Sequence, residues 1–157
     1  MPQEIERKFI LCKIPKDLPT LKIKQGYLQL DKNCTIRVRS SISSTGINDT
    51  LTIKGPSNSS GMSRYEFETK ISSEDSINLF KICYKPIIEK TRHIYIYKNM
   101  KWELDEFHKE NQGLLIGEVE LERDKFLKEF AYKNFYSGSK KDLILIGINK
   151  DLSKGIM

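Results

Sequence analysis

Polar and apolar residues alternate with a period of two along most of this chain, which is the pattern of β-strands. In residues 4–10, Ile5 and Phe9 lie on one face of the segment, and Glu4, Glu6 and Lys8 lie on the other. Turn residues such as the Gly55-Pro56 pair bound these runs. The same alternation predicts further strands over residues 25–31, 35–40, 51–54, 64–70, 87–92, 94–98, 101–106 and 115–122.

Two segments have helical spacing instead. The run Ser73-Glu74-Asp75 is a helix-start signal and predicts a short helix to about Cys83, with Ile77 and Phe80 facing inward. Apolar positions recur at helical intervals in residues 123–135, which predicts a second helix. The remaining connections are predicted loops at Asn48-Asp49 and Gly55–Gly61, and a tight hairpin at Lys98-Asn99.

Length and composition limit the classes of protein that fit. The 157 residues suit one domain with its own core, and no repeat or linker divides them, so we expect a single domain over residues 1–157. The net charge of +6 indicates an anionic partner without identifying it. No stretch is apolar and long enough to cross a bilayer, and the N-terminus lacks the layout of a secretory signal. Three scattered cysteines form neither a disulfide framework nor a zinc motif. We therefore expect a cytoplasmic protein.

The charged faces of the predicted strands consist almost wholly of Glu, Asp, Lys and Arg. For one strand alone, the simplest interpretation is a solvated surface. Taken together, the strands repeat like charges at positions i and i+2, which a solvent-facing surface rarely does. The positions are Glu4, Glu6, Lys8, Arg37, Arg39, Lys54, Arg64, Glu66, Glu68, Lys90, Arg92, Glu103, Asp105, Glu118 and Glu120.

Such faces need counter-charges if they point inward. Carboxylates two residues apart on a strand lie ~6.6 Å apart, and at an effective dielectric near 20 they repel by about 2.5 kcal/mol. Mg²⁺ or Mn²⁺ suits hard oxygen ligands, so the pairs Glu4/Glu6 and Glu118/Glu120 are candidate metal ligands. The Arg and Lys faces need a polyanion such as a triphosphate. We therefore expect an α+β, mainly β fold: a closed antiparallel β-barrel with a charged interior and flanking helices.

Eight short motifs, in order, resemble the CYTH superfamily, also called triphosphate tunnel metalloenzymes. The N-terminal Glu4-x-Glu6-x-Lys8 is similar to the ExExK signature of that family. The motifs lie within residues 4–122, and residues 123–157 depart from the family pattern. The other seven are Gln25-Gly26-Tyr27, Arg37-x-Arg39, Thr52-x-Lys54-Gly55, Arg64-x-Glu66-x-Glu68, Lys90-x-Arg92, Trp102-Glu103-x-Asp105-x-Phe107, and Glu118-x-Glu120 after Gly113-Leu114.

The resemblance implies an eight-stranded antiparallel tunnel and a role for each matching residue. It implies that Lys8 and Tyr27 form a catalytic dyad, that Glu66, Glu68 and Glu103 support the charged lining, and that the protein binds Mg²⁺ or Mn²⁺. The implied metal ligands are Glu4, Glu6, Asp105, Glu118 and Glu120. The implied phosphate ligands are Lys8, Arg37, Arg39, Lys54, Arg64, Lys90 and Arg92.

The motifs are most like those of short bacterial inorganic triphosphatases, so the expected reaction is metal-dependent hydrolysis of a triphosphate. The expected partner is a small-molecule triphosphate, inorganic or organic, and the resemblance allows a homodimer. The alternative on the same tunnel is an adenylyl cyclase of class IV type, which would convert ATP to cyclic AMP and pyrophosphate. A non-enzymatic binder has little need for the acidic faces. Nucleic acid is not the expected partner, because the arginines alternate into strand faces instead of clustering.

Overall fold

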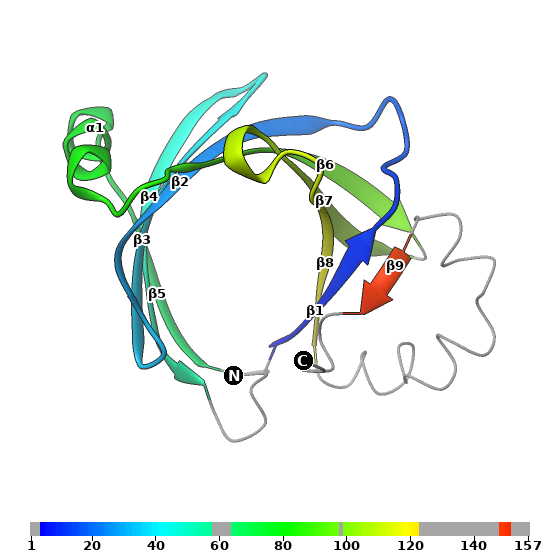
Figure 1. Ribbon diagram of the computed structural model, residues 1–157, viewed down its shortest axis with the longest axis horizontal. Coiled ribbons are helices and arrows are strands. Elements are labelled where there is room, and N and C mark those ends of the chain that lie inside the picture. Colours follow the sequence, from blue (N-terminus) through cyan, green and yellow to red (C-terminus); the bar gives the residue numbers. More distant parts are fainter. Residues whose placement is uncertain (1–3, 58–63, 98, 123–147, 152–157) are drawn as a thin grey trace. The chain divides into compact units, whose positions relative to one another are not determined.

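The computed structural model describes residues 4–57, 64–97, 99–122 and 148–151, and describes side chains within 7–56, 64–97 and 99–119. This part of the chain is mainly antiparallel β-structure with one α-helix (Figure 1). The elements are β1 (Glu4–Leu11), β2 (Thr20–Asp31), β3 (Cys34–Ser43), β4 (Gly46–Ser57), β5 (Arg64–Lys70), α1 (Ser73–Ile82), β6 (Ile88–Tyr97), β7 (Met100–Phe107), the 3₁₀ turn η1 (Lys109–Asn111), β8 (Leu115–Glu122) and β9 (Ile148–Asp151).

The strands pair in the order β5-β4-β3-β2-β6-β7-β8-β1-β9, with β5 and β9 at the two ends. The prediction of a mainly β, antiparallel fold is confirmed. Among the described strands, the two end strands do not pair with each other. Closure of the sheet into an eight-stranded barrel therefore stays a prediction. The chain divides into two compact units. The terminal unit comprises residues 1–19, 93–106 and 114–157, and the central unit comprises residues 20–92 and 107–113.

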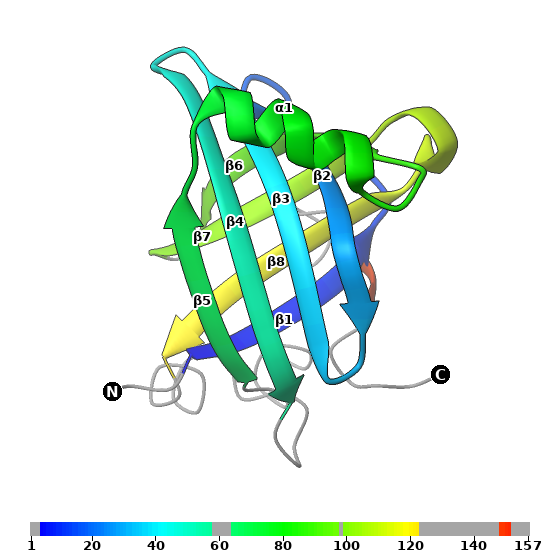
Figure 2. The ribbon, with the colours of Figure 1, turned by 90° about the vertical axis from the view of Figure 1, so that its left-hand side faces the viewer.

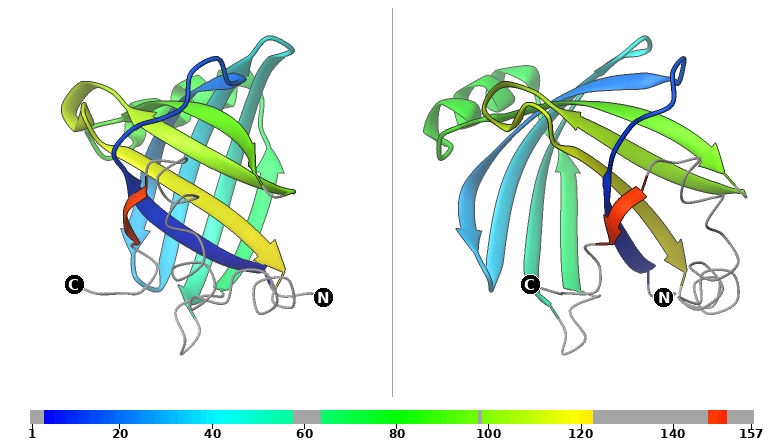
Figure 3. Two further views of the ribbon diagram at one scale, coloured as in Figure 1. Left: turned by 90° about the vertical axis from the view of Figure 1, so that its right-hand side faces the viewer. Right: turned by 45° about the vertical axis from the view of Figure 1, so that its right-hand side comes forward.

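In the terminal unit, β1 pairs with both β8 and β9, and β8 also pairs with β7 (Figure 3). The odd-numbered residues of β1 lie on one face, because side chains alternate along a strand. Phe9 and Trp102 meet on that face, with ring centroids 5.3 Å apart. Burying each large side chain of this kind contributes roughly 1.5–3 kcal/mol. The buried cluster comprises Phe9, Leu11, Met100, Trp102, Leu104 and Val119.

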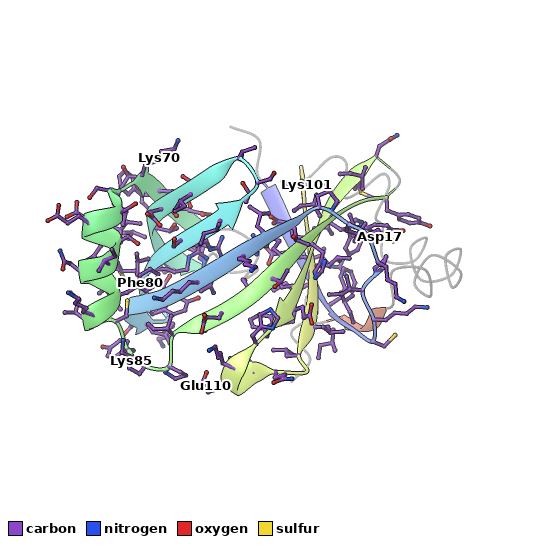
Figure 4. The ribbon with its side chains drawn as sticks, turned by 90° about the horizontal axis from the view of Figure 1, so that it is seen from above. Asp17, Lys70, Phe80, Lys85, Lys101 and Glu110 are labelled. Carbon is purple, nitrogen blue, oxygen red and sulfur yellow. The ribbon has the colours of Figure 1, made fainter. Side chains whose placement is uncertain are left out.

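In the central unit, β3 pairs with β2 and β4, β4 pairs with β5, and α1 lies across β2, β3 and β4 (Figure 2). Phe80 is on the side of α1 that faces these strands (Figure 4) and is buried with Val38 and Cys83. Burial raises the pKa of the Cys83 thiol above its ordinary value, and the nearby Lys85 ammonium partly offsets this. Gly26 permits the close approach, since a Cβ there would lie 2.8 Å from the Cys83 sulfur.

The helix differs from the prediction in its cap and its buried face. Its N-cap is Ser72, whose hydroxyl accepts a hydrogen bond from the backbone N–H of Asp75 at 3.0 Å. Phe80 is buried as expected, but its inward partner is Ser76, one turn earlier, and Ile77 is 60% exposed. Residues 76 and 80 share a face at i and i+4, whereas 77 is rotated away from it. The second predicted helix, residues 123–135, lies outside the described residues.

Three predicted connections are wrong, the second of them in part. Asn48 and Asp49 lie inside β4, where Asp49 is buried and accepts a hydrogen bond from the Ser73 hydroxyl at 3.1 Å. The backbone N–H of Ile71 donates to the Asp49 carbonyl at 3.0 Å, so this residue anchors the start of α1. Residues 55–57 of the predicted Gly55–Gly61 loop continue strand β4, and residues 58–61 lie outside the described residues. The predicted strands 87–92 and 94–98 are one strand, β6, over residues 88–97. The predicted hairpin after β6 contains Asn99 at φ 60°, a left-handed conformation that Asn tolerates.

No helix in the described part of the chain is long and apolar enough to cross a membrane. This agrees with the expectation from the sequence, while a cytoplasmic location and a single domain over residues 1–157 stay predictions.

Candidate active site

The charged residues of the terminal unit lie in cross-strand rows. Lys8 of β1 is in register with Glu118 of β8, which is in register with Glu103 of β7. In the next row, Glu6 is in register with Glu120. The buried cluster uses the intervening positions, so these rows occupy the opposite face of the strands. The alternation predicted this sorting, and the register confirms that β1, β7 and β8 contribute to one charged face.

Burial differs within this acidic face. Asp105 is 4% exposed, Glu103 and Glu118 are half-buried, and Lys8 is exposed. The described side chains form no group of three or more metal-type ligands. Three of the five predicted ligands have side chains outside the described set: Glu4, Glu6 and Glu120. The backbone register nevertheless brings carboxylate-bearing positions opposite one another, and such oxygen donors suit a hard divalent cation.

The central unit carries a second charged face, which is mainly cationic. One row runs Tyr27, Arg37, Thr52 and Glu68 across β2, β3, β4 and β5. Its neighbour runs Gln25, Arg39, Thr50 and Lys70 through the same strands. The face therefore combines arginines with short polar residues, several of them buried.

Arg39 is held by Gln25. The Nε and one terminal nitrogen of Arg39 both donate to the Gln25 side-chain oxygen, at 3.1 and 2.8 Å. Gln25 is 5% exposed, so this amide is fixed by its burial. Two hydrogen bonds to one acceptor fix the plane of the guanidinium group, and orientation of that plane decides whether it can bind phosphate oxygens in bidentate fashion.

Arg37 is held through Thr52. One terminal nitrogen of Arg37 donates to the Thr52 hydroxyl at 3.4 Å, and that hydroxyl donates to a Glu68 carboxylate oxygen at 2.9 Å. Thr52 is 1% exposed. Glu68 therefore supports Arg37 through a buried hydroxyl. Glu66 is in register with Lys54, and Arg64 is in register with Ser57 at the exposed strand β5.

Lys90 and Arg92 of β6 are both buried, and they share a face because they are two residues apart. The Lys90 ammonium lies over the Phe107 ring, 5.3 Å from its centroid. A cation over an aromatic face is stabilised by about 0.5–2 kcal/mol. Phe107 therefore contacts a predicted phosphate ligand, whereas Trp102 of the same strand is in the apolar cluster.

The structure distributes the predicted residues between the two units. The predicted metal ligands, Glu103 and Lys8 belong to the terminal unit. Tyr27, Glu66, Glu68 and all the predicted phosphate ligands except Lys8 belong to the central unit. The Lys8–Tyr27 dyad therefore draws on both units and stays a prediction.

Sequence reasoning missed two polar residues that hold the arginines, Thr52 and, as a side chain with a function, Gln25, and it missed Thr50, which is in register with Arg39. A signal was present for two of them. Thr50 and Thr52 precede Lys54 at i−4 and i−2, so they occupy the charged face of β4.

The two histidines contact other residues: His93 lies 3.3 Å from Glu106, and His108 lies 2.7 Å from the Thr91 hydroxyl.

The sequence and fold have known relatives. The CYTH domain family model matches residues 2–136. An inorganic triphosphatase of Acetivibrio thermocellus is 40% identical over 126 residues, which cover 77% of this chain and 76% of the relative. The crystal structure of the inorganic triphosphatase NE1496 has a TM-score of 0.64 at 25% identity, covering 98% of this chain and 89% of that one.

A third relative shows the fold alone. The Hippeastrum protein HpAC1, studied as an adenylyl cyclase and described as having a dominant triphosphatase activity, has a TM-score of 0.56 at 16% identity. The match covers 93% of this chain and 97% of that one. Because the family model spans most of the sequence and a curated relative is 40% identical, the chain belongs to the CYTH domain family.

Proposed function

We propose that this protein is a metal-dependent triphosphatase that hydrolyses inorganic triphosphate. The observation that carries the proposal is the sorting of charge into register: carboxylate rows in the terminal unit and arginine rows in the central unit. The name of the 40% identical relative, inorganic triphosphatase, supports the same reaction. A triphosphate with its metal ion needs both kinds of charge, whereas a simple anion-binding protein needs only the cations.

We also propose that the strands close into an eight-stranded tunnel with these faces inside. The family resemblance supports closure, because members of the family form an eight-stranded tunnel. A cytoplasmic location and a small-molecule triphosphate partner belong to the same proposal.

The residues that would hold the ion are Glu4, Glu6, Asp105, Glu118 and Glu120, and their oxygen donors fit Mg²⁺ or Mn²⁺. A divalent ion bound there supplies charge neutralisation at the phosphate oxygens. Carboxylates in cross-strand register repel one another, so a bound cation would reduce this repulsion.

The arginines position the substrate. Phosphoryl transfer depends mainly on placing the reacting groups in line and on stabilising the charge that spreads over the phosphate oxygens. Arg39, oriented by Gln25, and Arg37, oriented through Thr52, present guanidinium groups whose geometry is set before substrate binds. Preorganised donors of this kind need no rearrangement during the reaction. Lys54, Arg64, Lys90 and Arg92 add further charge, and the proposed Lys8–Tyr27 dyad would handle the proton of the attacking water.

The test is product analysis with tripolyphosphate, ATP and thiamine triphosphate, with Mg²⁺, Mn²⁺ or EDTA. We expect metal-dependent orthophosphate release, fastest with tripolyphosphate, and its loss in Arg39→Ala. The control is Lys32→Ala, which removes a cation from the exposed turn between β2 and β3. Cyclic AMP and pyrophosphate from ATP would favour the cyclase instead. No product from any substrate would reject the proposal.

A further inference from the structure

A cavity of about 440 Å³ opens on the central unit. Lys24 and Ser40, which are in register, line it. The next pair along the same strands, Gln25 and Arg39, belongs to the cationic face. Because successive residues of a strand point to opposite sides, Lys24 and Ser40 lie on the reverse side of the sheet from the arginines. Ile23 and Lys90 also border the cavity, so it shares Lys90 with the site proposed for the triphosphate, but its described lining contains none of the β3 arginines.

The turn after β7 builds one wall of this cavity. The backbone N–H of His108 donates to the Glu89 carbonyl at 2.9 Å, and the His108 ring lies 2.7 Å from the Thr91 hydroxyl. Lys109 has φ 57°, a left-handed backbone that is strained for lysine. Its ammonium lies 3.8 Å from the Glu89 carboxylate. These contacts hold the turn against β6, so the wall is fixed without a ligand.

The chemistry of the lining is cationic and apolar together. Lys22, Lys24 and Lys109 are exposed and line the cavity, whereas Glu89 is the one carboxylate in its described lining. The Lys24 ammonium lies 4.5 Å from the centroid of the Phe80 ring, which holds it near the strands. Ile42, 48% exposed, gives the cavity an apolar surface. A volume of this size is in the range of small-molecule sites.

We propose that this cavity binds a small organic phosphate, an anion with an apolar ring of the size of a nucleoside monophosphate. The phosphate would contact Lys22 and Lys109, and the ring would cover Ile42. Inorganic triphosphate lacks an apolar part, so it fits the arginine face better than this one. Lys90 also lines the cavity, and β6 therefore connects this site with a predicted phosphate ligand.

The experiment measures AMP binding to the full chain by isothermal titration calorimetry in EDTA, where no turnover occurs. The double variant Lys22→Ala/Lys109→Ala removes the two cations, and Ile42→Glu removes the apolar surface. The matched control is Lys32→Ala/Lys81→Ala, two exposed lysines of the same unit that lie outside the cavity lining. Arg39→Ala reports on the arginine face. Circular dichroism checks that each variant is folded, and phosphate release without AMP checks that Lys22→Ala/Lys109→Ala keeps its basal activity.

We expect one AMP site that weakens about tenfold or more in Lys22→Ala/Lys109→Ala and in Ile42→Glu, and stays unchanged in the control and in Arg39→Ala. Adenosine and inorganic phosphate should each bind more weakly than AMP. Absence of AMP binding would overturn the proposal, as would binding that is lost only in Arg39→Ala. Phosphate binding as tight as AMP would reject the organic class of ligand. These outcomes are independent of hydrolysis, so the proposed triphosphatase activity stands or falls separately.

Discussion

In the terminal unit, acidic positions face acidic positions across the strands, as in Glu6 with Glu120 and Glu103 with Glu118. In the central unit, the register gives each arginine of β3 neutral neighbours: Arg39, for example, is paired with Gln25 and Thr50. Like charges opposite one another destabilise a sheet. Carboxylates in register on the acidic face therefore repel one another, although Lys8 is in register with Glu118, whereas Arg39 and Arg37 are hydrogen-bonded to Gln25 and Thr52. We therefore expect binding of a metal ion to raise the free energy of unfolding by reducing this repulsion. Phosphate binding has no such repulsion between carboxylates to reduce.

The largest expected effect tests the acidic face. Glu118→Gln removes the carboxylate between Lys8 and Glu103, and we expect kcat/KM for tripolyphosphate to fall about 100-fold or more, because a metal ligand is lost. The increase in Tm that Mg²⁺ or Mn²⁺ gives the wild type should also disappear. The measurements are phosphate release and thermal unfolding across a metal titration.

The matched control for this substitution is Glu106→Gln, which neutralises an exposed carboxylate beside His93, outside the predicted metal set. Its activity and metal response should match the wild type. A Glu118→Gln protein that keeps a normal metal response would contradict the assignment of the acidic face.

The second prediction compares the close-packed glycines of the two units. A Cβ at Gly26 would lie 2.8 Å from the Cys83 sulfur and 2.9 Å from Ile87, whereas one at Gly117 would lie 3.1 Å from Leu11. We expect Gly26→Ala to lower the free energy of unfolding by about 1–3 kcal/mol, and Gly117→Ala by less. Urea denaturation measures both, and equal effects would show that the neighbours of Gly26 move aside easily.

The third prediction concerns the orientation of Arg39. Gln25→Ala removes the acceptor of two Arg39 hydrogen bonds, so we expect KM for tripolyphosphate to rise about 5–10-fold. The metal concentration for half-maximal activity should stay unchanged, because Gln25 belongs to the cationic face. Gln29→Ala, on the same strand, is the control. A change in metal requirement would mean that Gln25 acts on more than Arg39.

The smallest expected effect is a gain in stability. Glu103→Gln removes one of two carboxylates in register while leaving Glu118 beside Lys8. We expect the metal-free protein to gain about 0.2–1 kcal/mol in free energy of unfolding. Thermal unfolding in EDTA and in saturating Mg²⁺ checks this, because the gain should shrink once a cation is bound. A loss of stability in EDTA would refute the view that the acidic face is strained.

The sequence predicted some elements of the fold well and others wrongly. The alternation of β1, β3 and β8 predicted both the strands and the sharing of one face by charged residues, because a period of two fixes the side of each residue. The prediction of a loop at Asn48-Asp49 was wrong, because turn-forming residues also occur inside strands when tertiary hydrogen bonds satisfy their polar groups. Asp49 is such a case: its side chain and carbonyl hold the start of α1.

By itself, the sequence determined the strand pattern, the family and the sorting of carboxylates and cations, because these depend on local periodicity and on motifs that survive as short runs of residues. The tertiary structure decided which charged residues face one another and which neutral residues support them. Gln25 reaches Arg39, and Thr52 joins Arg37 to Glu68, through cross-strand register. The register is fixed by burial of the opposite face, and a shift of one residue would move every side chain to the other side.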